Sequence, residues 1–123
     1  MGGSIAGFCS GNITNVYSNA IVESASDEVG GIVGRFGSTY TKTISKCWFD
    51  GIVYGHNLYA GGIVGQVNMG EKTVSDCLVT GSVNNNWSGT NFPHTGGIVG
   101  GVYYTKPNAN TVASTLHLKI CWI

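Results

Sequence analysis

The sequence predicts an all-β protein, a parallel β-solenoid of about four coils of 28–35 residues each. The first observation is a repeated phrase, Gly-Gly-Ile-Val-Gly, at residues 30–34, 61–65 and 96–100, with a degenerate copy that begins at Gly2. A phrase that recurs every 20–50 residues is typical of solenoids and related arrays. The second observation is composition: 20 glycines and much Val, Ile and Thr favour tight corners and strands over helices.

The repeats divide one domain, residues 1–123, into four units. Their approximate bounds are 2–29, 30–60, 61–95 and 96–123. Six basic residues balance six acidic ones, so no net charge attracts nucleic acid or an anionic membrane. No apolar run is long enough to span a bilayer, and no leader is visible. We therefore expect no nucleic-acid partner and no membrane insertion.

Each central repeat reads as three short strands separated by corners. In the second repeat these are 30–36, 43–49 and 52–53, with a polar loop at 37–42 and a closing loop at 54–60. The third repeat matches phrase by phrase. Its strands are 61–67, 73–79 and 80–83, and its closing loop is 84–95.

Successive coils of a parallel solenoid pair strand on strand at about 4.8 Å, so equivalent residues stack in columns. The expected apolar columns are Ile32 over Ile63 over Ile98, Ile44 over Val74, and Val53 over Val83. The paired glycines, represented by Gly31, Gly62 and Gly97, would either turn with positive φ or pack where no side chain fits.

The two outer repeats depart from this pattern. In the first, Val16 stands where the central repeats have cysteine. In the fourth, residues 111–115 fit the second-strand template, and Leu116 then begins a period-2 alternation, one residue out of register. Terminal repeats commonly cap an array. Because the chain ends inside an expected strand, we expect adjoining coils of a longer chain, or like subunits, to cover the ends.

Four cysteines are present, and two of them, Cys47 and Cys77, share a repeat position. No Cys-x-x-Cys pair supports a zinc site. Stacked neighbours raise the question of a disulfide, but side chains pointing in parallel fit its geometry poorly. We expect buried free thiols that complete the core.

No group of residues has the pattern of a reaction centre. The acidic residues do not form the facing pair that a glycosidase needs, and the three histidines occupy different repeat positions. No phosphate-binding or calcium-loop phrase is present. We therefore expect no enzyme activity, no catalytic or metal-binding residue and no cofactor.

Aromatic residues are the one functional signal. Tyr17, Trp48 and Leu78 share the position after the cysteine, and Trp87 lies in the closing loop of the third repeat. Either these rings fold inward and complete the core, which we favour, or they point outward as an apolar stripe. An outward stripe would stack on sugar rings or dock a protein, with Tyr17, Trp48 and Trp87 as binding residues.

The phrase Gly-Gly-Ile-Val-Gly, a polar loop, [Ile/Val]-x-x-Cys and, four residues on, Gly-x-Val resembles the GLUG motif repeat. The resemblance covers residues 30–100 well, 2–29 loosely and 101–123 in part. This motif occurs in large secreted bacterial proteins, including adhesin-like proteins and immunoglobulin-A-type metallopeptidases. The resemblance implies an extracellular, bacterial cell-surface setting and a structural module, and it carries no catalytic residues.

Three functions follow as hypotheses. The first is a non-catalytic, adhesin-type repeat module that acts as a rigid stalk or spacer. The second is a subunit that stacks end to end into extracellular fibres, because a solenoid has open strand edges at both ends. The third is a module that binds a glycan or a host surface protein through the aromatic residues.

Overall fold

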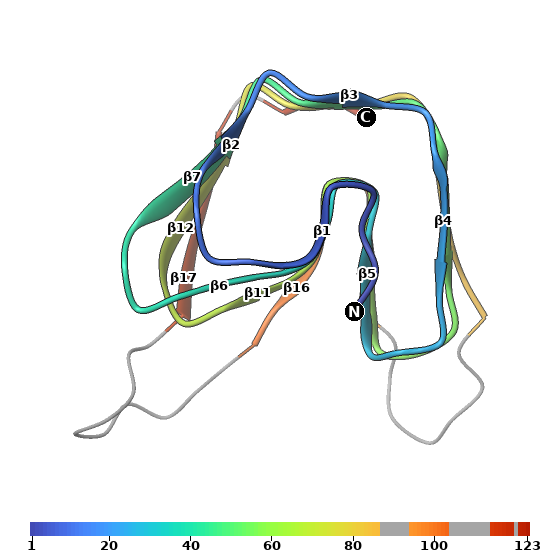
Figure 1. Ribbon diagram of the computed structural model, residues 1–123, viewed down its shortest axis with the longest axis horizontal. Helices are drawn as coiled ribbons and strands as arrows, with labels where there is room; N and C mark the ends of the chain where they lie inside the picture. The colour runs from blue at the N-terminus through green and yellow to red at the C-terminus, as the bar shows by residue number, and fades with distance from the viewer. Residues whose placement is uncertain (87–93, 104–113, 120) are drawn as a thin grey trace.

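The computed structural model describes residues 1–86, 94–103, 114–119 and 121–123, and this part of the chain is all-β without a helix. Parallel strands stack coil over coil, as the sequence predicts (Figure 1). The first coil holds β1 (Ala6–Cys9), β2 (Ile13–Thr14), β3 (Tyr17–Ser18) and β4 (Ile21–Ser24). The second holds β5 (Glu28–Gly30), β6 (Val33–Gly37), β7 (Lys42–Ser45), β8 (Trp48–Phe49) and β9 (Ile52–Gly55).

The third coil repeats the five strands of the second, and the fourth contributes three described strands. They are β10 (Tyr59–Gly61), β11 (Val64–Asn68), β12 (Gly70–Ser75), β13 (Leu78–Val79), β14 (Ser82–Asn85), β15 (His94–Gly96), β16 (Val99–Val102) and β17 (Ser114–Lys119). Equivalent strands form five parallel sheets, ordered β1-β6-β11-β16, β5-β10-β15, β2-β7-β12-β17, β3-β8-β13 and β4-β9-β14. The second and third coils each hold five strands, so the prediction of three strands per coil is wrong. Two additional corners divide these coils further.

One of these corners uses residues other than glycine. Asn15, Lys46 and Asp76 stand at equivalent positions and have φ values of 59°, 53° and 52°. Each lies between a strand of the β2-β7-β12 sheet and the following short strand. A non-glycine residue pays a steric cost in this left-handed region, and Asn and Asp tolerate it best. The corner thus recurs without a glycine to mark it.

The Gly-Gly-Ile-Val-Gly phrase makes the second corner, at which the chain folds back on itself. Figure 1 shows β5 and the start of β6 running side by side in the middle of the coil, joined by a tight turn. A Cβ on Gly30 would lie 2.0 Å from the carbonyl oxygen of Val33, and one on Gly31 would lie 2.0 Å from that of Gly62. Close packing is therefore the reason for these glycines.

The alternative expectation, positive φ at the motif glycines, is wrong. Among the described residues only Gly70 is a glycine in that region, with a φ of 69°. Gly62 and Gly97 repeat the crowding of Gly31: a Cβ on Gly62 would lie 2.2 Å from the carbonyl oxygen of Gly97, and one on Gly97 would lie 2.8 Å from Ile123 Cδ1.

The predicted apolar columns form the core. Ile32, Ile63 and Ile98 are buried, and backbone hydrogen bonds of 3.1 Å and 2.8 Å link them from coil to coil. The register also pairs Ile44 with Val74, and Val53 with Val83. Each column removes apolar surface from water across the coils that it spans.

The register corrects the sequence alignment at both ends. Gly2 pairs with Val29, so the degenerate first copy of the motif begins one residue later than predicted, at Gly3. In the fourth coil Thr73 pairs with His117 and Val74 with Leu118, so the second-strand template begins at His117 and not at residue 111 as predicted. Residues 111–113 of that prediction lie outside the described residues. The described part of the chain contains no helix that is long and apolar enough to cross a membrane.

A buried lysine closes the corner between β11 and β12. Lys72 Nζ donates hydrogen bonds of 2.8 Å to Ser38 O, 2.7 Å to Tyr40 O and 2.8 Å to Met69 O. Burial, and next the charge of Lys42, lower the pKa of this ammonium group. The bonds to Ser38 and Tyr40 hold the loop of the second coil against the third, a role that no feature of the sequence indicates.

Candidate functional site

Two surface features could bind a partner: a column of aromatic side chains on one outer face, and a polar groove where the chain folds back. The aromatic column consists of Tyr17, Trp48, Leu78 and Trp122, which lie at equivalent positions of successive coils. Tyr17 is 53% exposed, Trp48 42% and Trp122 59%. The preference for inward-folding rings is therefore wrong for Tyr17 and Trp48.

The corner at Lys46 explains this orientation. Cys47 and Phe49 point into the core, and side chains alternate along a strand, so Trp48 between them points outward. The rings of Tyr17 and Trp48 lie 4.7 Å apart, between centroids, at an interplanar angle of 57°. Such a tilted pair is a favourable aromatic contact.

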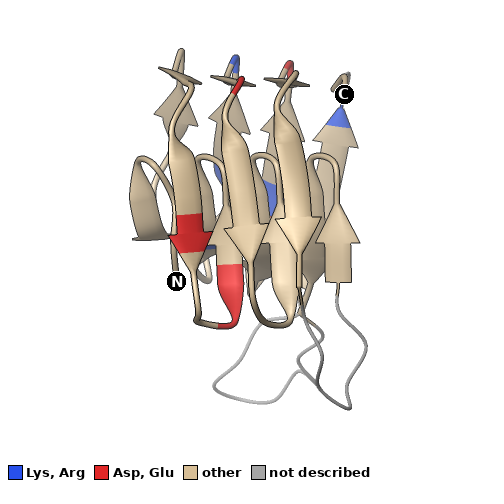
Figure 2. Ribbon diagram, turned by 90° about the vertical axis from the view of Figure 1, so that its right-hand side faces the viewer, with Lys and Arg blue, Asp and Glu red and all other residues tan. Residues whose placement is uncertain are grey.

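A chain of hydrogen bonds fixes the indole of Trp48. Its Nε1 donates to Thr80 Oγ1 at 2.7 Å, and the Thr80 hydroxyl donates to Asp50 Oδ1 at 2.6 Å. Ile21 on β4, the next strand along the chain after β3, is also exposed. Figure 2 shows this neighbouring side of the solenoid, where charged residues are sparse.

Of the predicted binding residues, the structure brings Tyr17 and Trp48 together, while Trp87 lies outside the described residues. Trp122 is a further member of the column that was not predicted. The signal was present, because Leu118-x-x-Cys121-Trp122 repeats the phrase Ile44-x-x-Cys47-Trp48.

The same phrase places a third cysteine in the core column. Cys47, Cys77 and Cys121 stand at equivalent positions, and all are free thiols. Cys47 and Cys77 are buried, as predicted. The thiols of Cys47 and Cys77 donate to Ser45 O at 3.3 Å and to Ser75 O at 3.2 Å. The interaction between the two thiols lowers the pKa of Cys47 to about 7, and the same interaction, together with burial, raises the pKa of Cys77. Burial keeps this pair from reagents in water.

The groove lies between the sheet β5-β10-β15 and the sheet β1-β6-β11-β16, which the Gly-Gly turn sets face to face. Its tip consists of glycine backbone. Its mouth is lined by side chains that differ from coil to coil: Glu28, Tyr59 and His94 on one sheet, and Arg35, Gln66 and Gly101 on the other. A cavity of about 380 Å³ lies here, and of these six residues Glu28, Tyr59, Arg35 and Gln66 line it.

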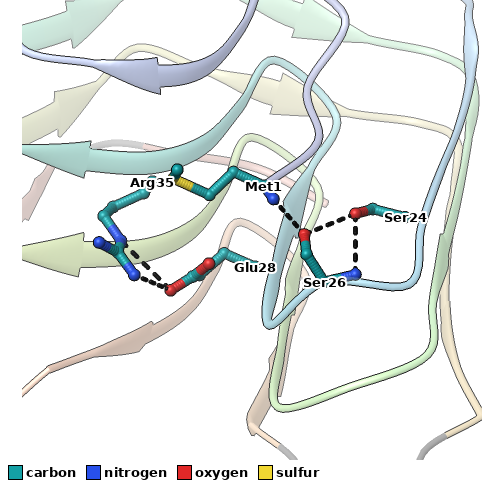
Figure 3. A network of polar contacts seen from close by, with 5 residues as sticks. All are labelled: Met1, Ser24, Ser26, Glu28 and Arg35. Atoms are coloured by element: carbon teal, nitrogen blue, oxygen red, sulfur yellow. Dashed lines mark hydrogen bonds and ion pairs between the residues drawn. The ribbon is translucent and has the colours of Figure 1, made fainter.

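An ion pair crosses the groove in the second coil. Glu28 on β5 and Arg35 on β6 point toward one another in Figure 3. Arg35 Nε donates to Glu28 Oε1 at 3.2 Å, and Nη2 donates to the same oxygen. Glu28 is only 3% exposed, and a carboxylate at such a depth needs a paired cation. Beside it, the Met1 ammonium donates to Ser26 Oγ, which ties the first residue to the bend before β5.

In the third and fourth coils the groove is lined by an amide and by stacked rings. Gln66 is 3% exposed, and its Oε1 has no hydrogen-bond partner among the described residues. Tyr59 and His94 stack with ring centroids 4.9 Å apart and planes at 14°. Gly101 has no side chain, and the Tyr59 ring occupies the space that a Cβ there would need. A buried polar atom without a partner costs about 1–3 kcal/mol.

A second ion pair lies outside the groove. His56 Nε2 lies 2.8 Å from Glu23 Oε2 on the surface. In the described part of the chain, no three His, Cys, Asp or Glu side chains are placed to hold a metal ion.

No relative was found. Comparisons with protein-family models, curated proteins and solved structures gave no match to this chain.

Proposed function

We propose that the chain is a non-catalytic structural module that acts as a rigid stalk or spacer, displayed outside a bacterial cell. The observation that supports this function is the continuous parallel register from coil to coil. Strands of all five sheets pair with their equivalents in the neighbouring coil, so the backbone hydrogen bonds run along the axis of the solenoid. A stack of this kind resists bending and extends by about 4.8 Å per coil.

The two ends support joining to further coils. The first coil exposes Ile5 and Phe8, and the last exposes Leu118, Trp122 and Ile123. A cavity of about 530 Å³ lies beside Ile123, over β13 and β14. The outer edge of β14 has no strand partner in the described part of the chain. Unpaired edges and apolar side chains fit a continuing coil better than water.

A length measurement tests the spacer. Chains that contain one, two and four copies in tandem should form straight rods in negative-stain images, each copy adding about 19 Å, or four coils of about 4.8 Å. Rods that bend at every junction, or a length that does not grow with copy number, would contradict the proposal.

The same open ends favour a second function, assembly of separate chains into fibres. Sedimentation velocity of the single-copy chain over a range of concentrations separates the two. A monodisperse monomer excludes fibres and leaves the spacer, while growth into long species supports assembly.

A third function uses the aromatic column. Its exposed rings offer a stacking surface for a glycan or a host surface protein. A glycan array probed with the wild type and with Trp48→Ala tests this function. Equal signals from the two chains would rule out the column as the binding surface.

A further inference from the structure

We propose that the groove between the β5-β10-β15 and β6-β11-β16 strands binds a neutral, hydroxyl-rich ring, such as a sugar. The site is separate from the aromatic column and does not depend on the spacer function. Its volume of about 380 Å³ falls within the range of about 300–1,000 Å³ that small-molecule pockets occupy.

The first argument is the unpartnered acceptor. Gln66 Oε1 is buried in the groove wall, and no described group donates to it. Buried polar atoms are normally hydrogen-bonded, and an exception calls for an explanation. A ligand hydroxyl that donates to this oxygen would supply the missing bond.

The second argument is that the ion pair keeps hydrogen-bonding capacity. Both nitrogens that Arg35 uses donate to a single oxygen of Glu28, Oε1. The guanidinium group has five N–H donors, and the carboxylate has a second oxygen. The pair can therefore donate to one hydroxyl and accept from another. A sugar presents adjacent hydroxyls that do both.

The third argument is the aromatic wall. Tyr59 lines the cavity and stacks on His94, and Tyr103 lines it from just beyond the end of β16. A sugar ring has an apolar face of C–H groups that packs on aromatic rings, while Asn68 in the same cavity supplies an amide for its hydroxyls. Rings beside convergent polar groups are the usual composition of a ligand site.

Charge argues against other ligands. The described lining contains two acidic side chains, Asp27 and Glu28, and one basic side chain, Arg35, which leaves an excess of one negative charge. An anion such as phosphate would be repelled. In this part of the chain no three His, Cys, Asp or Glu side chains are placed to hold a divalent cation.

The test uses the whole chain and Gln66→Leu, which keeps the volume of the side chain and removes the acceptor. The probes are methyl glycosides of glucose, galactose, mannose and N-acetylglucosamine, and short oligosaccharides of the same sugars. Putrescine, a cation, and inorganic phosphate, an anion, test the alternative ligand classes. Saturable NMR shifts of the backbone amides of Tyr59 and Asn68 report binding. Thr73→Val, which removes one polar group from β12 outside the groove, is the matched control.

We expect at least one sugar to bind, a tenfold or greater loss of affinity in Gln66→Leu, and no change in Thr73→Val. Tighter binding of the oligosaccharide than of its methyl glycoside would identify the ligand as part of a glycan, and equal binding would identify a free sugar. The melting temperature of Gln66→Leu should equal or exceed that of the wild type, because the variant no longer buries an unpartnered oxygen. Three results would each overturn the proposal: no sugar binding, binding of putrescine or phosphate alone, or sugar binding that Trp48→Ala weakens and Gln66→Leu does not.

Discussion

Replacement of Gly31 by alanine tests whether the repeated phrase exists because backbone packs against backbone. The new Cβ would lie 2.0 Å from the carbonyl oxygen of Gly62 and 2.5 Å from the ring of Phe49. Overpacking of a core costs about 1–3 kcal/mol. The carbonyl oxygen belongs to the next coil and cannot turn away, so the coils must separate locally. That movement weakens about two backbone hydrogen bonds, each worth about 1 kcal/mol.

We therefore expect Gly31→Ala to lose about 3–5 kcal/mol, a large part of the 5–15 kcal/mol that stabilises a typical domain. Urea unfolding followed by circular dichroism measures the loss. With a slope of about 1–3 kcal/mol per molar urea, the midpoint should fall by roughly 2 M. Gly11→Ala is the matched control, because a Cβ there meets nothing within 4 Å, and it should leave the midpoint unchanged or raise it slightly. If the two variants unfold at the same urea concentration, the packing argument is wrong.

Three further predictions concern titratable groups. A thiol reagent should modify the half-buried Cys9 and Cys121 in the folded chain and reach the buried pair only after unfolding, which mass spectrometry of the labelled chain would show. Because the pKa of Lys72 is lowered, the unfolded chain binds more protons than the folded chain just below pH 10.5. The free energy of unfolding should therefore rise with pH in that range. Lys72→Met should remove this pH dependence in urea titrations. Arg35→Met should cost about 3 kcal/mol in the same assay by leaving Glu28 buried without a cation, and adding Glu28→Leu should recover part of that loss.

The architecture was predictable because the repeats make it redundant. Ile32, Ile63 and Ile98 occur within the same phrase, so their stacking requires only that the coils stay in register. The predicted alignment of the fourth repeat was wrong because this redundancy ends there. Paired residues of β12 and β17 are 44 positions apart, as Val74 and Leu118 are, whereas paired residues of β7 and β12 are 30 apart. An added stretch of chain before β17 therefore shifted the alignment.

The orientation of the aromatic column was not predictable for a different reason. Whether Trp48 faces in or out depends on the parity of the strand after its corner, and that corner is made by Lys46 at positive φ. Lysine carries no sequence signal for a left-handed turn, whereas glycine would. The groove was missed because Glu28, Tyr59 and His94 occupy one column without resembling one another, so no repeat marks them.

The contrast between the tip and the mouth of the fold-back supports a binding role for the groove. At the tip, every coil must present glycine, because a Cβ on Gly30 or Gly61 would lie 2.0 Å from a carbonyl oxygen. At the mouth no such constraint acts, and a module that served only as a spacer could repeat one paired contact in every coil. Instead the ion pair of the second coil gives way to Gln66, which the neighbouring coils leave unsatisfied. A stacking scaffold tolerates this cost at one coil, and a bound hydroxyl would remove it.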